Sequence, residues 1–253
     1  MADQLNSISI TGVAASLAAA MGIETPTQAN PAIDQIVNLV KNGIDGGRVD
    51  RVFMYNPDAV AMWLYQKYTA LFDNVVKHTA LSVPLQTVMP SVTPVCFGSL
   101  YTGAFPAVHG IQKYEKPVIR IDTLFDALNR AGKKPVIIGD PHCSLSHIFL
   151  ERDMDYFTGD TIEAINKKAM ELIEEDKYDF YVVYNGNYDS LMHKFGPESD
   201  EAMAQLRDNV ASFDRLITAL KQKWTNHDTL FAFAMDHGCH EIDGNCGSHG
   251  LDM

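Results

Sequence analysis

The chain has 253 residues, 46% of them hydrophobic, and a formal net charge of −12. This composition is typical of a globular protein with a sizeable core, and the negative charge argues against a nucleic-acid backbone or an anionic membrane as the main partner. No apolar run reaches the roughly 20 residues of a membrane span. The first basic residue is Lys41, so no signal peptide is evident and we expect a cytoplasmic protein.

The first 50 residues are predicted to form a layer of helices. Thr11 can cap a helix that Gly22 ends, and a second helix is expected near Ala32–Asn42. Neither a repeat nor a low-complexity linker divides the chain. We therefore expect residues 1–253 to form a single domain, without a separate cap domain.

A short apolar run, Val52–Tyr55, is typical of a buried strand, and Asp58 follows it at the start of a helix predicted to run towards His78. A carboxylate at this junction can cap the helix. It can also bind a metal ion, because α/β sheets place ligands at the carboxyl ends of their strands. The residue alone leaves both roles open.

The segment Met89–Pro94 contains two prolines, which restrict the backbone just before a predicted helix. Thr93 lies at the start of this helix, where the helix dipole and free backbone N–H groups suit a phosphate. The Thr93 hydroxyl is therefore either a nucleophile or an ordinary N-cap, and partners elsewhere in the chain must decide.

The following segment shows the helix and strand of a βαβ unit. Asp122 is the expected helix cap, and Val136–Asp140 reads as a buried strand. His142, Cys143 and His147 come next, but their spacing fits no closed zinc pattern. We interpret these three residues as structural or pocket-lining.

Another apolar run, Phe180–Tyr184, leads into Asp189 and His193. A spacing of four lets both side chains reach one point from a helical turn, so the pair is a candidate metal site. The alternative is an ion pair on the surface. The clearest helix covers residues 199–224, where apolar residues at steps of three and four favour packing against the sheet.

The C-terminal stretch carries most of the candidate ligands. An apolar run stops at Asp236 and His237, and His249 follows twelve residues after His237. Asp and His side chains bind Zn or Mn ions; the alternative is a surface loop rich in histidine. Cys239 and Cys246 lie in this loop, where free thiols are preferred over a disulfide or a further ion site.

Together these motifs resemble the alkaline phosphatase superfamily, in particular its type I phosphodiesterase and nucleotide pyrophosphatase branch. The resemblance covers about residues 50–253. The matching motifs are Pro90-Ser91-Val92-Thr93-Pro94, Thr102-Gly103 with Pro106 and His109-Gly110-Ile111, Asp189 with His193 and Gly196-Pro197, Asp236-His237-Gly238, and Gly247-Ser248-His249-Gly250.

The resemblance implies an α/β fold with a central, mostly parallel sheet between helices and a site at the carboxyl edge of its strands. It also implies two divalent cations, zinc by preference or manganese. The implied ligands form two sets, Asp189, His193 and His249 for one ion and Asp58, Asp236 and His237 for the other. The hydroxyl of Thr93 would lie close to the second ion.

Thr93 would then be the nucleophile of a metal-dependent phosphohydrolase. A cation lowers the pKa of its hydroxyl, attack on phosphorus forms phosphothreonine, and the second cation stabilises the leaving oxygen and then activates water. A small phosphodiester, phosphomonoester or phosphonate would be the substrate. Phosphoryl transfer, as in phosphomutases of the superfamily, and a metal- or ligand-binding module without turnover are the alternatives; a homo-oligomer is not excluded.

Three further residues are candidates for substrate contact. Family phosphodiesterases place an asparagine a few residues after the His-Gly motif, and Tyr114 stands near that position here. Asn187 is a second candidate, and His109 a third, although we expect His109 to buttress its loop. The family's usual Asp-Gly reads Asp58-Ala59 here. The chain stops four residues after His249, where family members usually continue, so we expect His249 to be weakly held.

Overall fold

A computed structural model of the chain describes residues 8–242, 246–250 and 253. At its centre lies a sheet of five parallel strands in the order β3-β2-β4-β1-β5. The strands are β1 (Arg51–Pro57), β2 (Pro135–Gly139), β3 (Asp155–Thr158), β4 (Phe180–Asn185) and β5 (Thr229–Phe233). The predicted α/β class with a parallel central sheet is confirmed.

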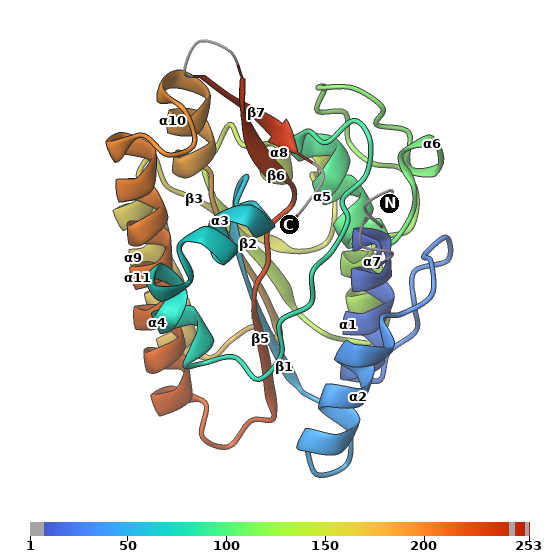
Figure 1. The fold of residues 1–253 in the computed structure, drawn as a ribbon. Coiled ribbons are helices and arrows are strands. Elements are labelled where there is room, and N and C mark those ends of the chain that lie inside the picture. Colours follow the sequence, from blue (N-terminus) through green and yellow to red (C-terminus); the bar gives the residue numbers. More distant parts are fainter. Residues whose placement is uncertain (1–7, 243–245, 251–252) are drawn as a thin grey trace, which may run out of the picture.

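Helices cover both faces of this sheet (Figure 1). One layer contains α1 (Val13–Met21), α2 (Asp34–Gly43), α5 (Thr93–Thr102), α6 (Pro106–His109), α7 (Leu124–Arg130) and α8 (Ser144–Ile148). The other contains α3 (Met62–Lys67), α4 (Asp73–Val76), α9 (Ile162–Glu175), α10 (Asn187–Phe195) and α11 (Asp200–Lys223). In the part of the chain that the structure describes, no helix is both long and apolar enough to cross a membrane.

Alternate residues of the central strands enter two separate hydrophobic cores. Val52 and Met54 of β1 pack with the α1, α5 and α7 layer, whereas Phe53 and Tyr55 pack with the α9 and α11 layer. Successive strand residues point to opposite faces, and a parallel sheet covered on both faces buries both sets. This explains why β1 reads as an uninterrupted apolar run. The apolar stripe of α11 forms much of the second core, as its spacing predicted.

Two expectations about the segment that follows β1 were wrong. Asp58 does not begin a helix, because the chain turns through Ala59 (φ 63°) and α3 starts only at Met62. The segment towards His78 is also broken, by a 3₁₀ turn at Thr69–Phe72 between α3 and α4. The capping role of Asp58 is thereby excluded.

The expected C-terminal loop instead contains an antiparallel hairpin of β6 (Gly238–Ile242) and β7 (Cys246–Gly250). Cys239 lies opposite His249 in this hairpin, not opposite Cys246. The thiol of Cys239 is free and buried, and burial raises its pKa to about 11. The side chain of Cys246, and with it the expected state of that thiol, lies outside the described residues.

A charged cluster joins the amino ends of β1, β4 and β5. His227 places Nδ1 2.6 Å from Asp50 Oδ2 and Nε2 2.9 Å from Asp176 Oδ2. Arg51 bridges Asp176 (3.3 Å) and Asp179 (2.8 Å). Both ring nitrogens of His227 can donate only when the imidazole is protonated. Burial lowers the pKa of His227, but its hydrogen bonds to Asp50 and Asp176 outweigh burial and raise it.

We expect His227→Gln to lower the free energy of unfolding by about 1–3 kcal/mol at pH 6, because two charge-assisted hydrogen bonds are lost. A raised folded pKa stabilises the protein fully below the unfolded value of 6.5 and progressively less as the pH rises through the folded value. Urea unfolding of wild type and variant between pH 5.5 and about 9 should show the difference shrinking with pH. His240→Gln, at an exposed histidine, is the control; a gap independent of pH would contradict the assignment.

Candidate active site

The site residues come from separate elements that meet at the carboxyl edge of the sheet. Asp58 directly follows β1, and the segment after β5 supplies Asp236 and His237. Thr93 is the first residue of α5. All four side chains are almost fully buried, with exposed fractions of 0–5%.

The four residues form one compact group around the imidazole of His237. Its Nε2 lies 3.2 Å from Asp58 Oδ1, 3.5 Å from Asp236 Oδ2 and 3.4 Å from Thr93 Oγ. The Thr93 hydroxyl also lies 3.4 Å from Asp58 Oδ2. The structure therefore brings the predicted nucleophile and one predicted ligand set together.

Hydrogen bonds on the outside of this group fix its orientation. His237 Nδ1 donates to the carbonyl of Gly238 at 2.9 Å, so in the neutral ring Nε2 keeps its lone pair towards the carboxylates. The phenol of Tyr184 donates to Asp58 Oδ2 at 2.5 Å, and the Ala59 N–H donates to Asp236 Oδ1 at 3.3 Å. Each carboxylate thus has one oxygen held by the protein and one directed elsewhere.

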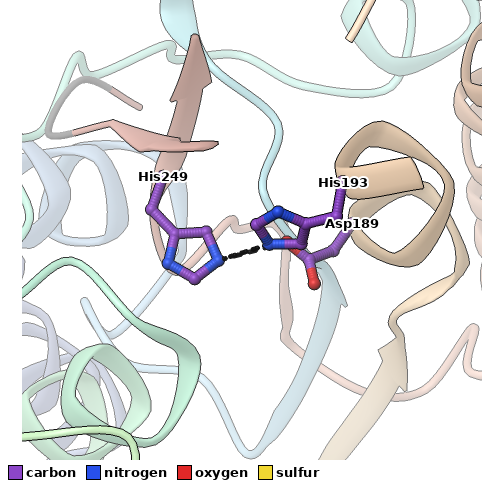
Figure 2. A group of neighbouring side chains, drawn as sticks. All are labelled: Asp189, His193 and His249. Carbon is purple, nitrogen blue, oxygen red and sulfur yellow. Dashed lines mark hydrogen bonds and ion pairs between the residues drawn. The ribbon is translucent and has the colours of Figure 1, made fainter. Parts of the chain in front are cut away.

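The second ligand set meets beside the first. Asp189 and His193 lie one turn apart on α10, and His249 reaches them from β7 (Figure 2). The two Nε2 atoms of His193 and His249 are 2.8 Å apart, and they lie 3.3 and 3.6 Å from Asp189 Oδ1. Asp189 also groups with Asp58 and His237, so the two sets are continuous.

Close packing of the hairpin against α10 holds His249 in place. A Cβ atom on Gly247 would lie only 2.0 Å from Met192 Sδ, so only glycine allows this approach. The Gly247 carbonyl accepts the Nδ1–H of His193 at 3.0 Å. Trp63 anchors the other strand by donating to the Cys239 carbonyl at 2.6 Å.

The electrostatics of the site are those of negative charges forced together. Burial, and then the neighbouring carboxylate of Asp58, raise the pKa of Asp236 well above its usual range. Burial lowers the pKa of His237, but Asp236 and Asp58 outweigh burial and raise it to about 10. Burial would likewise raise the pKa of Asp189, but the adjacent imidazoles of His193 and His249 lower it. A positive charge placed among these carboxylates would stabilise the arrangement.

Unpartnered atoms show where such a charge fits. Among the described residues, Asp58 Oδ1, Asp189 Oδ1 and Asp236 Oδ2 are buried without a hydrogen-bond partner. Buried polar atoms are nearly always satisfied, and carboxylate oxygens with imidazole nitrogens are ligands of Zn and Mn ions. The residues present therefore fit divalent cations.

A cavity of about 250 Å³ opens from Asp58 and Thr93 along the strand ends. Tyr114 and Asn187 both line it, where a substrate could touch them. His109 is absent from the described residues that line it. This histidine is buried, receives the Ile111 N–H on Nδ1 and lies 3.0 Å from the Ser99 hydroxyl. Burial lowers its pKa to about 4. These contacts fit the expected buttressing role.

Two residues of this region escaped the sequence analysis. Tyr184 was assigned only to a strand, and its bond to Asp58 depends on how β1 and β4 are paired. Lys116, two residues after Tyr114, lines the cavity as well. The sequence signal that could have identified Lys116 is its proximity to Tyr114, which was already a candidate for substrate contact.

Parallel strands thus deliver buried acidic and imidazole side chains, two groups of which could hold a metal ion, to one edge of the sheet, next to a hydroxyl at a helix start. This arrangement suits a metal-dependent enzyme that acts on phosphoesters. The family model described as type I phosphodiesterase / nucleotide pyrophosphatase matches residues 118–252. The chain belongs to this family, which is part of the alkaline phosphatase superfamily. A sequence search against curated proteins gave no match. The matched range excludes Asp58 and Thr93, so the match does not bear on these two residues.

We expect Asp236→Asn to stabilise the metal-free protein by roughly 1–3 kcal/mol near pH 8. Its raised folded pKa means that Asp236 opposes folding increasingly as the pH rises above about 4. The same change should reduce the rise in Tm caused by Zn²⁺ or Mn²⁺, because one of the two candidate ion sites loses a ligand while Asp189, His193 and His249 remain. Thermal unfolding with chelator and with each ion measures both effects.

Asp153→Asn, at an exposed carboxylate, is the matched control for this experiment. The control should change neither the Tm in chelator nor the response to metal. An Asp236→Asn protein that is less stable in chelator, or that keeps the full metal response, would contradict the assignment.

Proposed function

We propose that the protein is a metal-dependent phosphohydrolase of the phosphodiesterase and nucleotide pyrophosphatase type. Thr93 is its nucleophile, and two divalent cations, zinc by preference or manganese, complete its site. One cation would be held by Asp58, Asp236 and His237. The other would be held by Asp189 with His193 and His249, the second ligand set defined above. The substrate is a small phosphorylated compound.

One observation carries this proposal: the Thr93 hydroxyl lies against two of the proposed metal ligands, Asp58 and His237. Its Oγ is 3.4 Å from both Asp58 Oδ2 and His237 Nε2 and opens onto the cavity. As the first residue of a ten-residue helix, it also lies in the positive field of the helix dipole. A threonine used only as an N-cap would bond a backbone N–H of its own helix, yet α5 has no side-chain cap and begins after Val92.

The chain's own groups then support a two-step hydrolysis. Bound cations supply the positive charge that lowers the pKa of a hydroxyl and offsets the charge on phosphoryl oxygens. Thr93 Oγ attacks phosphorus while its proton passes towards Asp58 Oδ2, and the ester oxygen leaves with the alcohol. Water then attacks the phosphothreonine, and Thr93 regains a proton. Tyr184 holds Asp58 in place throughout through its hydrogen bond.

Mono- and diester substrates should both be assayed, since both classes are candidates. The first experiment pairs metal analysis of the purified protein with hydrolysis of p-nitrophenyl phosphate and bis(p-nitrophenyl) phosphate after addition of Zn²⁺ or Mn²⁺. Turnover of neither ester with both ions bound would favour the non-catalytic binding module. Transfer of the phosphoryl group to an added alcohol would favour a phosphomutase-like reaction.

We expect Thr93→Ala to lower kcat by at least about 10³-fold while keeping the metal-induced rise in Tm, because it removes the nucleophile and no carboxylate or imidazole. Thr93→Ser should retain part of the activity. Ser91→Ala, which removes the neighbouring buried hydroxyl, is the control. Full activity in Thr93→Ala, or loss of activity in Ser91→Ala alone, would refute the nucleophile assignment.

A further inference from the structure

The far wall of the active-site cavity carries a positive charge that the proposed chemistry does not use. The cavity runs from Thr93 and Asp58 past the end of β4 to the ends of β2 and β3. Lys116 lies on this wall, on the chain that follows α6, and is half-buried. The ammonium group is therefore part of the space that a substrate enters.

Lys116 is incompletely neutralised by the protein. Its Nζ donates one hydrogen bond, to the carbonyl of His142 at 2.6 Å. Across the described ranges, no carboxylate forms an ion pair with Lys116, although the net charge is −12. The adjacent Glu115 pairs instead with Lys113 at 3.3 Å. An ammonium has three donors, so two remain for a ligand.

The aromatic neighbour of Lys116 helps to place this charge. Nζ lies 5.8 Å from the centre of the Tyr114 ring, within the range of a cation–π contact. Tyr114 itself is 63% exposed and lines the same cavity. The pair forms a cationic and aromatic wall facing the metal ligands.

Two carboxylates on the cavity limit where an anion can lie. Asp140 accepts the N–H of His142 at 2.7 Å and is half-buried, and Asp160 is exposed. Both belong to the strand ends; Lys116 comes from the loop after α6, and its Nζ reaches the end of β2 by bonding the His142 carbonyl. The first turn of α9 also lines this end, and its dipole offsets the charge of Asp160. An anionic group is therefore favoured at the Lys116 ammonium, where the lysine charge and the α9 dipole oppose the repulsion from Asp140 and Asp160.

We propose that the natural substrate carries a second anionic group, a carboxylate or a phosphate, which Lys116 binds. This rests on the proposed function, because the first phosphoryl group must lie at Thr93. β4 and β2 are neighbours in the sheet, and neighbouring strands lie about 4.8 Å apart. The second anion thus lies roughly 5–10 Å from the phosphoryl group, a span that suits a short molecule in a cavity of about 250 Å³.

Matched aryl phosphates test this inference. 4-Carboxyphenyl phosphate and 1,4-phenylene bisphosphate carry a second anion, and 4-carbamoylphenyl phosphate is a neutral counterpart of similar shape. We expect Lys116→Met to lower kcat/KM by about 10- to 100-fold for a probe with the second anionic group, mainly through KM, and less than about 2-fold for the carbamoyl ester. The probe whose kcat/KM falls more in Lys116→Met shows which second group, carboxylate or phosphate, the site prefers.

Two further variants make the result specific to the charge at this position. Lys116→Arg should restore much of the loss, because the positive charge remains. Lys113→Met, at the neighbouring lysine that is paired with Glu115, should affect no probe. Equal kcat/KM ratios for charged and neutral esters in wild type and Lys116→Met would overturn the inference and leave the hydrolase proposal intact.

A binding measurement separates this inference from the proposed function. If no ester is hydrolysed with Zn²⁺ or Mn²⁺ bound, the hydrolase proposal fails. Calorimetric titration of the metal-loaded protein with phenylphosphonate and 4-carboxyphenylphosphonate then decides alone. The second anion site is supported if wild type binds 4-carboxyphenylphosphonate more tightly than phenylphosphonate and Lys116→Met does not. Equal affinities for the two compounds in both proteins overturn it.

Discussion

The site depends on carboxylates that the fold buries side by side. Asp58 and Asp236 face the same imidazole nitrogen of His237 in a region that excludes water. Two desolvated negative charges at this separation repel each other strongly, and one histidine proton can offset only part of that repulsion. The packing of the surrounding strands and cores offsets this repulsion in the folded protein. A multivalent cation bound between the carboxylates would remove the repulsion and so bind favourably.

The two edges of the sheet show how differently the same residue types can be used. At the amino edge, His227 and Arg51 neutralise three aspartates, and this cluster joins strands. At the carboxyl edge, comparable aspartates and histidines point inward with oxygens that no described residue satisfies. Parallel strands bring chain segments together at both ends, so the contrast lies in whether counter-charges are built in. Built-in ion pairs with arginine and histidine, more than the presence of aspartate, distinguish the amino edge from the carboxyl edge.

Many of the helices and strands could be predicted because their residue patterns and their end signals agreed within one stretch of chain. The runs at β1 and β4, the stripe of α11 and the Gly22 stop of α1 each follow from residue patterns that one stretch of chain contains. The ligand motifs were also recognisable, although which of them meet depends on strand order. Other features could not be read locally. β3 is short and half-exposed, and the cap of α7 is Thr123, not Asp122.

The position of β5 has a consequence for how the site opens. β5 is an edge strand, paired only with β1, and all five of its residues are incompletely buried. Edge strands with one partner separate from a sheet at lower free energy than central ones. Because Asp236 and His237 follow the end of β5 after only two residues, its detachment would withdraw both side chains at once. Opening of β5 and binding of an ion at the adjoining candidate site would then be coupled. An ion bound there would slow the hydrogen exchange of the β5 amides.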